Sequence, residues 1–346
     1  MDKEHIIHKN QTVLTVLKRL DELASNAILF VVNNDQILLG SISDGDIRRG
    51  LIKGLNLENE LLDFVQENPK YFTSKDYNFN EMVNWREHNY RIIPVINSNK
   101  QIVDIINFSQ QRSYLPVDAV IMAGGKGTRL LPLTQDTPKP LLMVGEKPIV
   151  EYNIDRLKLY GIRNITLSIK YLGEQIKKYF KNGEAKQLTI DYIKEDQPLG
   201  TIGAVSLKDS FVHDYILVMN SDILTNIDFE DMFKVFVEKD ADMAVATTPY
   251  EVDIPYGVIE TNNDQIIGLK EKPTYTYYSN AGIYLIKKTA LNNIPKGEHF
   301  NATDLMEKLY TSGKTVTHYP ILGYWLDIGK PHDYKKAQQD IEHIKF

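Results

Sequence analysis

The sequence predicts an α/β protein in which a mixed, mostly parallel sheet follows a smaller domain built from an internal repeat. Two observations lead to this prediction. From about residue 117 onward, short apolar runs alternate with amphipathic helical patterns, as in parallel strands joined by crossover helices. Before residue 113, a pattern of two apolar strands around a polar turn occurs twice. We therefore expect domains at 1–112 and 117–346, joined by a linker within residues 110–117.

Length and composition are those of an ordinary globular protein. A chain of 346 residues fits two domains, and 42% of its residues are hydrophobic. The net charge of −6 argues against a nucleic-acid partner, because binding nucleic acid requires clustered cations. The chain has no cysteine, so disulfides and thiolate metal sites are excluded. No apolar run approaches the ~20 residues of a membrane span, so we expect a cytoplasmic protein without a membrane partner.

The repeat aligns residues 28–46 with residues 92–110 at a constant offset of 64, without a gap. Each copy consists of an apolar strand, an Asn-rich turn and a second apolar strand. An amphipathic helical pattern precedes both copies. One helix and one hairpin cannot bury their apolar faces alone, so we expect the two copies to pack together.

The repeat resembles a pair of CBS modules, the tandem unit called a Bateman domain. The strand-end pattern of that family is G-x-[IV]-[ST]-x-x-D, and the first copy matches it at Gly40, Ile42, Ser43 and Asp46. The second copy departs from it, with Asp104, Asn107 and Gln110. The resemblance implies one regulatory nucleotide site at most, with Ser43 and Asp46 contacting ribose and phosphate. CBS pairs also tend to self-associate, so we expect a homo-oligomer.

An alternative for the repeat domain needs no ligand. Ser43 is also suited to cap a helix that begins at Asp44, and the pair would then only pack against a partner subunit. The sequence leaves both interpretations open.

The most informative stretch begins with an apolar strand at 119–122 that leads into a glycine-rich loop. Glycines allow successive backbone N–H groups to converge on an anion, because no Cβ blocks close approach. Arg129 adds a bidentate phosphate donor and Lys139 a compact positive charge. Pro138 and Pro140 restrict the backbone on either side of Lys139. This combination predicts a polyphosphate site.

Two common phosphate loops do not fit this stretch. A Walker loop needs GK followed by Ser or Thr, but Lys126 is followed by Gly127. The dinucleotide fingerprint GxGxxG does not match GGKGTR, which argues against a dehydrogenase.

The remaining elements follow the α/β rhythm. We expect helices at 148–160, 173–181, 201–208 and 228–238, strands at 164–169, 188–194, 215–219 and 242–248, and a hairpin formed by 256–261 and 265–269. Ligands in such sheets bind beyond the carboxyl ends of the strands. Asp222 follows the strand at 215–219, where a carboxylate beside a polyphosphate is well placed to hold Mg²⁺.

The run from Ala123 to Leu141 resembles the sugar-1-phosphate nucleotidylyltransferases. It reads A-G-G-x-G-T-R-L-x-P-L-T-x-x-x-P-K-P-L without a break. The resemblance covers about the last two thirds of the chain and implies a Rossmann-like nucleotidyltransferase domain. It also implies an enzyme that joins an NTP to a sugar 1-phosphate and releases pyrophosphate. The implied nucleotide-binding residues are Ala123, Gly124, Gly125, Gly127, Thr128, Leu199 and Gly200, the last two in a P-L-G-T-x-G-A loop whose Thr201 is expected to cap the next helix.

The resemblance also implies the catalytic, metal and sugar residues. The catalytic cations are Arg129, Lys139 and Lys272, and the Mg²⁺ ligands are Asp222 and Asp327, the latter in a W-x-D-x-G run. The sugar contacts are Tyr256, Gly257, Glu271 and Asn280.

The substrates are less defined than the reaction. A CBS pair ahead of this domain resembles the guanylyltransferases of legionaminic acid synthesis, which implies GTP and glucosamine 1-phosphate. Mannose or heptose 1-phosphate, and UTP, CTP or dTTP, are the alternatives. A non-catalytic nucleotide-sugar sensor is an alternative of another class, but such proteins usually lose the catalytic Arg, Lys or Asp, and all are present here.

Overall fold

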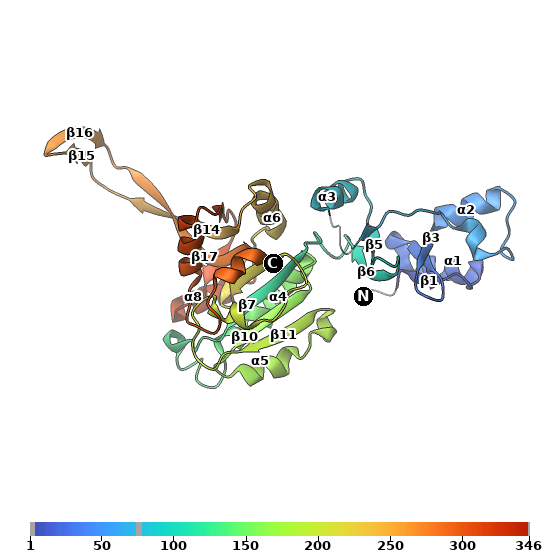
Figure 1. The fold of residues 1–346 in the computed structure, drawn as a ribbon, viewed down its shortest axis with the longest axis horizontal. Coiled ribbons are helices and arrows are strands. Elements are labelled where there is room, and N and C mark those ends of the chain that lie inside the picture. Colours follow the sequence, from blue (N-terminus) through green and yellow to red (C-terminus); the bar gives the residue numbers. More distant parts are fainter. Residues whose placement is uncertain (1–3, 74–77, 345–346) are drawn as a thin grey trace. The chain divides into compact units, whose positions relative to one another are not determined.

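The computed structural model describes residues 4–73 and 78–344, and the chain divides into two compact units, Met1–Tyr114 and Leu115–Phe346 (Figure 1). The boundary falls inside the stretch expected to be the linker. Each unit has its own sheets and its own hydrophobic clusters. No helix in the described ranges is both long and apolar enough to cross a bilayer.

The first unit contains two similar halves. The first half comprises β1 (Ile6–His8), α1 (Val13–Leu23), η1 (Ala24–Asn26), β2 (Ile28–Val32), β3 (Leu38–Ser43), α2 (Asp44–Ile52) and η2 (Leu61–Phe64). The second comprises β4 (Phe72–Thr73), α3 (Phe79–Glu87), β5 (Ile92–Ile96) and β6 (Ile102–Asn107). The sheets run β1-β2-β3 and β4-β5-β6. In both halves a parallel pair is followed by an antiparallel hairpin.

The two halves share a hydrophobic cluster. Phe30 and Val32 from the first hairpin pack with Ile92, Ile96 and Ile102 from the second. An isolated β-bridge between Ile37 and Gln101 joins the two hairpin turns. Each half thus buries through the other the apolar surface that it cannot bury alone.

The second unit is built on a seven-stranded sheet with the order β11-β10-β7-β12-β17-β14-β18. Its strands are β7 (Val117–Ala123), β10 (Asn164–Ile169), β11 (Thr189–Lys194), β12 (Tyr215–Asn220), β14 (Met243–Asp253), β17 (Thr274–Lys287) and β18 (Val316–Pro320). Within this sheet only β17 is antiparallel to its neighbours. The prediction of a mixed, mostly parallel sheet is confirmed.

Helices cover both faces of this sheet. Side chains alternate between faces along a strand, and β12 displays the two sides. Tyr215 packs edge-on against Phe233 and Phe236 of α6 (Phe229–Glu238). Ile216 and Val218 instead share a cluster with residues of α7 (Ala302–Thr311). The other helices are α4 (Ile149–Leu159), α5 (Gly173–Phe180) and α8 (Pro331–Asp340).

Several short elements complete this unit. They are β8 (Met143–Val144), β9 (Lys147–Pro148), β13 (Ile223–Thr225), β19 (Trp325–Asp327), and the 3₁₀ segments η3 (Thr128–Leu130), η4 (Lys139–Leu141), η5 (Glu184–Lys186), η6 (Gly203–Leu207) and η7 (Lys288–Asn293). The pairing of β13 with β19 is antiparallel and brings the chain's C-terminal region beside the end of β12. The prediction of a helix at 201–208 is wrong, because only the five-residue 3₁₀ segment η6 forms there.

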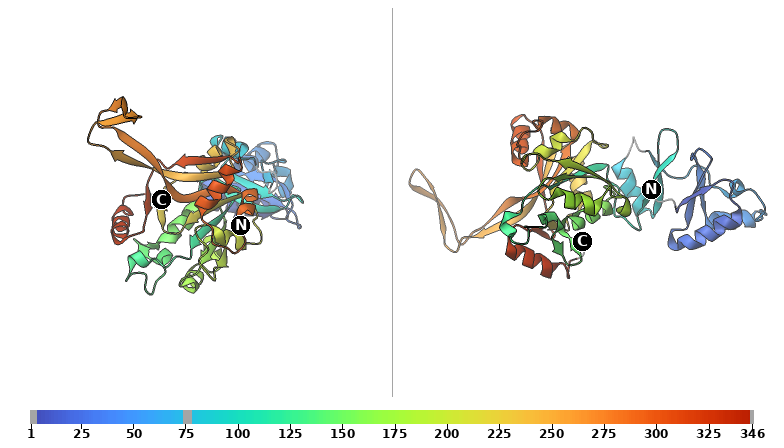
Figure 2. Two further views of the ribbon diagram at one scale, coloured as in Figure 1. Left: turned by 60° about the vertical axis from the view of Figure 1, so that its left-hand side comes forward. Right: turned by 90° about the horizontal axis from the view of Figure 1, so that it is seen from below.

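The outer halves of β14 and β17 leave the body of this unit as a two-stranded ribbon. The ribbon continues into the hairpin of β15 (Val258–Asn262) and β16 (Gln265–Lys270), and Figures 1 and 2 show it projecting outward. We refer to residues 249–278 as the arm. Burial ends at its base, since β14 is buried through Thr247 and β17 from Ala281 onward.

Candidate active site

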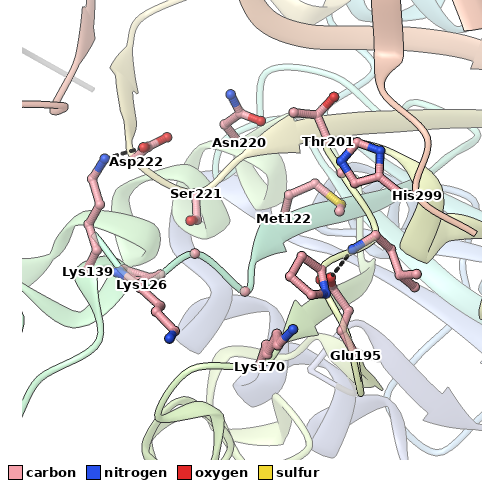
Figure 3. A pocket seen from close by; sticks show the side chains of 16 residues that line it. Met122, Lys126, Lys139, Lys170, Glu195, Thr201, Asn220, Ser221, Asp222 and His299 are labelled. Carbon is pink, nitrogen blue, oxygen red and sulfur yellow. Dashed lines mark hydrogen bonds and ion pairs between the residues drawn. The ribbon is translucent and has the colours of Figure 1, made fainter. Parts of the chain in front are cut away.

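A cavity of about 430 Å³ opens where four parallel strands of the second unit end (Figure 3). Chain segments that follow β7, β10, β11 and β12 contribute Gly124, Lys170, Glu195 and Ser221 to its wall. Carboxyl ends of parallel strands meet at one edge of a sheet, which is where α/β proteins bind ligands. The full lining is Met122, Gly124, Gly125, Lys126, Lys139, Pro140, Lys170, Glu195, Pro198, Leu199, Gly200, Thr201, Asn220, Ser221, Asp222 and His299.

The glycine loop after β7 is shaped by a buried carboxylate. Glu195 accepts hydrogen bonds from the Ser168 hydroxyl (2.6 Å) and from the backbone N–H of Leu199 (3.2 Å). A Cβ at Gly124 would lie 2.8 Å from Glu195 Oε1, so any larger residue would have to displace this hydrogen-bonded carboxylate. Gly127 has φ +63° and is held by Thr134, whose hydroxyl donates to the Gly127 carbonyl (2.9 Å).

Lys139 and Asp222 form an ion pair at one end of the cavity, as Figure 3 shows. Lys139 is only 7% exposed, and the short 3₁₀ turn η4 that begins with it fixes its direction. Asp222 lies just beyond β12, so the sheet positions its carboxylate. A positive and a negative group thus meet, partly removed from water, where the phosphate chemistry would occur.

A second carboxylate lies next to this pair. Asp327 ends β19, directly opposite Ile223, and the Ile328 N–H donates to the Asp222 carbonyl (3.0 Å). Burial raises the pKa of Asp327 and the charge of Asp222 raises it further, while Lys139 and Arg129 oppose the shift. Its Oδ1 is buried and lacks a hydrogen-bond partner within the described part of the chain. Arg129 packs against Gly329, where an added Cβ would lie 3.3 Å from its guanidinium.

A second glycine loop forms the opposite wall. Gly200 has φ +77°, and a Cβ there would lie 2.5 Å from the Phe300 carbonyl oxygen. The Thr201 hydroxyl accepts from the N–H of Ala302 (2.9 Å), the first residue of α7. Thr201 therefore accepts from the first helical N–H of α7, 101 positions along the chain. The expectation that it caps the next helix is wrong, because the segment that follows it, η6, has no side-chain cap.

Some of the predicted nucleotide-binding, catalytic and metal-binding residues line the cavity, and others lie near it. Gly124, Gly125, Leu199, Gly200, Lys139 and Asp222 line the cavity. Ala123, Gly127 and Thr128 belong to the same strand and loop without lining it, and Arg129 and Asp327 lie beyond the Lys139–Asp222 pair.

The predicted sugar residues are divided between the body and the arm. Tyr256, Gly257, Glu271 and Lys272 all lie on the arm, and none of them lines the cavity. Asn280 is at the arm's base, where its Oδ1 accepts from the Gly282 N–H (2.9 Å). A Cβ at Gly282 would lie 2.6 Å from the side chain of Asn220, so this base packs beside the cavity wall.

Besides Lys139 and Asp222, the cavity is lined by four titratable residues, and none of these four was predicted as a site residue from the sequence. Lys170 and Glu195 each follow the last residue of a strand, so the strand-end rule that selected Asp222 could also have selected them. Lys126 lies in the glycine loop itself. His299 precedes α7 and reaches the cavity only through the tertiary fold, so no local signal points to it.

In the first unit, Ser43 and Asp46 contact each other. Asp46 Oδ2 accepts from the Ser43 N–H (2.8 Å) and hydroxyl (2.5 Å), and Arg49 donates to Asp46 Oδ1 (2.6 Å). These bonds close the first turn of α2, which is the arrangement expected for a helix cap.

The sequence was compared with known protein families. Residues 118–344 match the family model described as nucleotidyl transferase. The chain belongs to the nucleotidyl transferase family. The match begins one residue into β7 and so includes every strand that contributes to the cavity.

Curated members of this family act on different sugars and bases. A D-glycero-alpha-D-manno-heptose 1-phosphate guanylyltransferase from Aneurinibacillus thermoaerophilus is 32% identical over 234 residues, covering 66% of this chain and 99% of the relative. A UTP--glucose-1-phosphate uridylyltransferase from Synechocystis sp. is 31% identical over 239 residues, which cover 63% of this chain and 62% of the relative. The chain thus spans nearly all of the first nucleotidyl transferase but under two thirds of the second.

A solved structure resembles the second unit. It is that of a Bacillus anthracis protein named "Putative Glucose-1-Phosphate Thymidylyltransferase", with 25% identity and a TM-score of 0.55, covering 66% of this chain and 97% of that one. The likeness supports the nucleotidyl transferase fold described above.

Proposed function

We propose that this protein transfers a nucleotidyl group from an NTP to a sugar 1-phosphate and releases pyrophosphate. The observation that carries the proposal is the cavity at the strand ends, where a glycine loop, Lys126, Lys170 and the Lys139–Asp222 pair converge. The names of the heptose- and glucose-1-phosphate relatives support the same reaction type.

The reaction needs positioning more than acid–base catalysis. An oxygen of the sugar 1-phosphate attacks the α-phosphorus of the NTP, a new P–O bond forms, and the bond to the β-phosphate breaks. The attacking phosphate is already an anion near neutral pH, so no general base is required. Catalysis therefore depends on holding two polyanions together and offsetting their repulsion.

The cationic side chains are assigned to this task. Lys139 holds the sugar phosphate beside the α-phosphate, together with Lys272, and Arg129 stabilises the departing pyrophosphate. The backbone of Gly124 and Gly125 approaches the triphosphate, with Lys126 and Lys170 facing the same space. Leu199 and Gly200 contact the base, and Glu271 and Asn280 the sugar hydroxyls.

Asp222 and Asp327 fit a magnesium ion. The unpartnered, buried Oδ1 of Asp327 and its proximity to a second carboxylate are what a bound cation would relieve. Within the described ranges, no group of three or more His, Asp or Glu side chains is arranged to hold a metal. Two carboxylates suit Mg²⁺, which takes its other ligands from phosphate oxygens and water. When bound, the ion would neutralise phosphate charge.

We propose GTP and glucosamine 1-phosphate as the substrates, in a cytoplasmic pathway such as legionaminic acid synthesis. The heptose relative is itself a guanylyltransferase, which supports GTP. Mannose or heptose 1-phosphate, and UTP, CTP or dTTP, are the competing choices.

We also propose that the first unit is a CBS pair. Its pseudo-repeated halves and shared hydrophobic cluster support this assignment. A regulatory nucleotide at Ser43 and Asp46 would have to compete with the bonds that cap α2. Titration of AMP, ATP and GTP into Asp222→Asn protein, with Ser43→Ala as comparison, tests for this second site.

The first experiment measures pyrophosphate release with Mg²⁺ across GTP, UTP, CTP and dTTP. The acceptors are the 1-phosphates of glucosamine, N-acetylglucosamine, mannose, heptose and glucose. Turnover with GTP and glucosamine 1-phosphate alone supports the full proposal. Turnover with another pair keeps the reaction and replaces the substrates. No turnover, from protein that binds a nucleotide, would instead favour a sensor.

A further inference from the structure

Between Arg129 and Lys139 the chain runs through a series of turns at residues 131–137, which we call the outer loop. Its backbone hydrogen bonds are short-range: the Leu133 N–H, for example, donates to the Leu130 carbonyl (3.0 Å). Turns of this kind shape a segment locally, but they do not fix where the segment lies on the protein. The position of the outer loop, and with it that of the two cations, therefore depends on contacts from other segments.

Two side chains from the segment after β10 hold the outer loop. The Tyr171 hydroxyl donates to the carbonyls of Gln135 (2.7 Å) and Thr134 (3.1 Å). The side-chain amide of Gln175, in the first turn of α5, donates to the Asp136 carbonyl (2.9 Å). Three consecutive carbonyls of the outer loop are thus bound by two side chains that lie close together in the sequence.

Thr134 connects this anchor to the catalytic lysine. It is fully buried, and its hydroxyl donates to the Gly127 carbonyl (2.9 Å). A Cβ at Gly127 would lie 3.0 Å from side-chain atoms of both Thr134 and Lys139, so these three residues are in close contact. Because Lys139 is itself only 7% exposed, a displacement of Thr134 would move the lysine relative to Asp222.

Tyr171 is also firmly connected to the central sheet. β10 pairs with β7 on one side and with β11 on the other, and it ends at Ile169. Tyr171 follows two residues later, directly after the cavity residue Lys170. Asp222 lies just beyond β12 of the same sheet. The Tyr171 hydroxyl thus ties the outer loop to the sheet that also positions the partner of Lys139, and sites held by rigid elements are the more precise ones.

We propose that Tyr171 is a positioning residue: its hydroxyl holds the outer loop and, through Thr134 and Gly127, keeps Lys139 aligned with Asp222. The inference rests on the proposed function, because it assigns Lys139 to the reacting phosphates. Tyr171 does not line the cavity, so it acts through the outer loop rather than on a substrate. Small misplacements of a phosphate-binding group lower the rate of the chemical step more than they weaken ground-state binding.

The Tyr171→Phe variant tests the proposal, because it removes the hydroxyl and keeps the ring. We expect kcat for pyrophosphate release to fall about 10-fold, while KM for the NTP changes less than about twofold. The assay is run well below the unfolding temperature of the variant, so that a loss of stability does not lower the amount of folded enzyme. A wild-type kcat in Tyr171→Phe would overturn the proposal.

Tyr192→Phe is the matched control. Tyr192 is half-buried like Tyr171, and its hydroxyl also donates to a backbone carbonyl, that of Lys181 at the far end of α5 (2.6 Å). The substitution removes the same kind of hydrogen bond without touching the outer loop. We expect Tyr192→Phe to keep the wild-type kcat. An equal loss of kcat in both variants would reveal a general structural effect and would also overturn the proposal.

Hydrogen–deuterium exchange tests the anchor without relying on activity. The backbone amides of the outer loop are followed in wild type and in both variants, without substrates. We expect faster exchange there in Tyr171→Phe and wild-type exchange in Tyr192→Phe. Unchanged exchange in Tyr171→Phe would overturn the anchoring role. If wild-type protein releases no pyrophosphate but the outer loop exchanges faster in Tyr171→Phe, the proposed function fails while the anchor stands.

Discussion

The Lys139 ammonium and the Asp222 carboxylate form an ion pair at one end of the cavity, although the two residues are 83 positions apart. Lys139 is supplied by the long glycine loop and Asp222 by the end of β12. Each therefore compensates the charge of the other until a phosphate binds to Lys139 and a cation binds to Asp222. The pair keeps two opposite charges aligned at the point where the reacting phosphates would meet.

Replacing Asp222 by Asn should abolish turnover while leaving the fold intact. Asn keeps an oxygen that can accept from Lys139 but removes the charge assigned to cation binding. We expect pyrophosphate release to fall at least about 10²-fold, with an unchanged circular dichroism spectrum. Asp214→Asn, an exposed position before the same strand, is the matched control and should retain activity. Near-normal activity in Asp222→Asn would refute the proposed metal role.

The two cavity glycines should respond differently to alanine. A Cβ at Gly124 lies 2.8 Å from Glu195 Oε1, whereas one at Gly125 has no atom within 4 Å. Gly124→Ala should lower the free energy of unfolding by about 1–3 kcal/mol, as overpacking does. Gly125→Ala should leave that free energy unchanged and weaken only nucleotide binding. Urea unfolding and nucleotide titration check both, and equal stability losses would contradict this explanation of the loop.

Chelation should stop the reaction. Asp327 is half-buried beside Asp222, and its buried Oδ1 has no hydrogen-bond partner among the described residues, an arrangement that a divalent cation would stabilise. We expect EDTA to abolish pyrophosphate release and excess Mg²⁺ to restore it. Asp327→Asn should abolish pyrophosphate release even in excess Mg²⁺. Its melting temperature should not fall, because the substitution removes the repulsion between the Asp327 and Asp222 carboxylates. Full activity in EDTA would exclude the assignment.

Asp118 should make stability depend on acid pH. Burial raises the pKa of Asp118, but hydrogen bonds from His213 (2.8 Å) and Asn164 (3.2 Å) outweigh it and hold the pKa below its ordinary value of 3.8. Because the pKa is lower in the folded state, the carboxylate stabilises the fold above pH 3.8, and this contribution is lost as pH falls through the folded value.

The Asp118→Asn variant isolates that contribution. Asp118 also accepts from the N–H groups of Val212 (2.6 Å) and His213 (3.1 Å), so it ties a loop to β7. We expect a loss of about 1–3 kcal/mol in the free energy of unfolding at pH 7. The difference from wild type should shrink below pH 3.8, as measured by urea unfolding at several pH values. A difference independent of pH would argue against the carboxylate's role.

Local patterns predicted most of the second unit because they depend on neighbours in the chain. The strand at 164–169 matches β10, and the helix at 173–181 is one residue longer than α5, because apolar periodicity reflects a single face of one element. The segment at 201–208 differed because Gly203 packs directly against the backbone at Glu298, where a Cβ would lie 2.5 Å from a carbonyl oxygen. That close contact is made by tertiary packing and leaves only a 3₁₀ turn.

The sequence by itself determined the mostly parallel α/β class, the glycine loop with Arg129 and Lys139, and the carboxylate at the end of β12. Each depends on contiguous residues or on one rule about strand ends. Only the tertiary structure decided that Glu195 shapes the loop, that His299 lines the cavity, and that Glu271 and Lys272 project on an arm. Each of these features depends on contacts between segments that are far apart in the sequence. Local sequence patterns do not specify which distant segments come into contact.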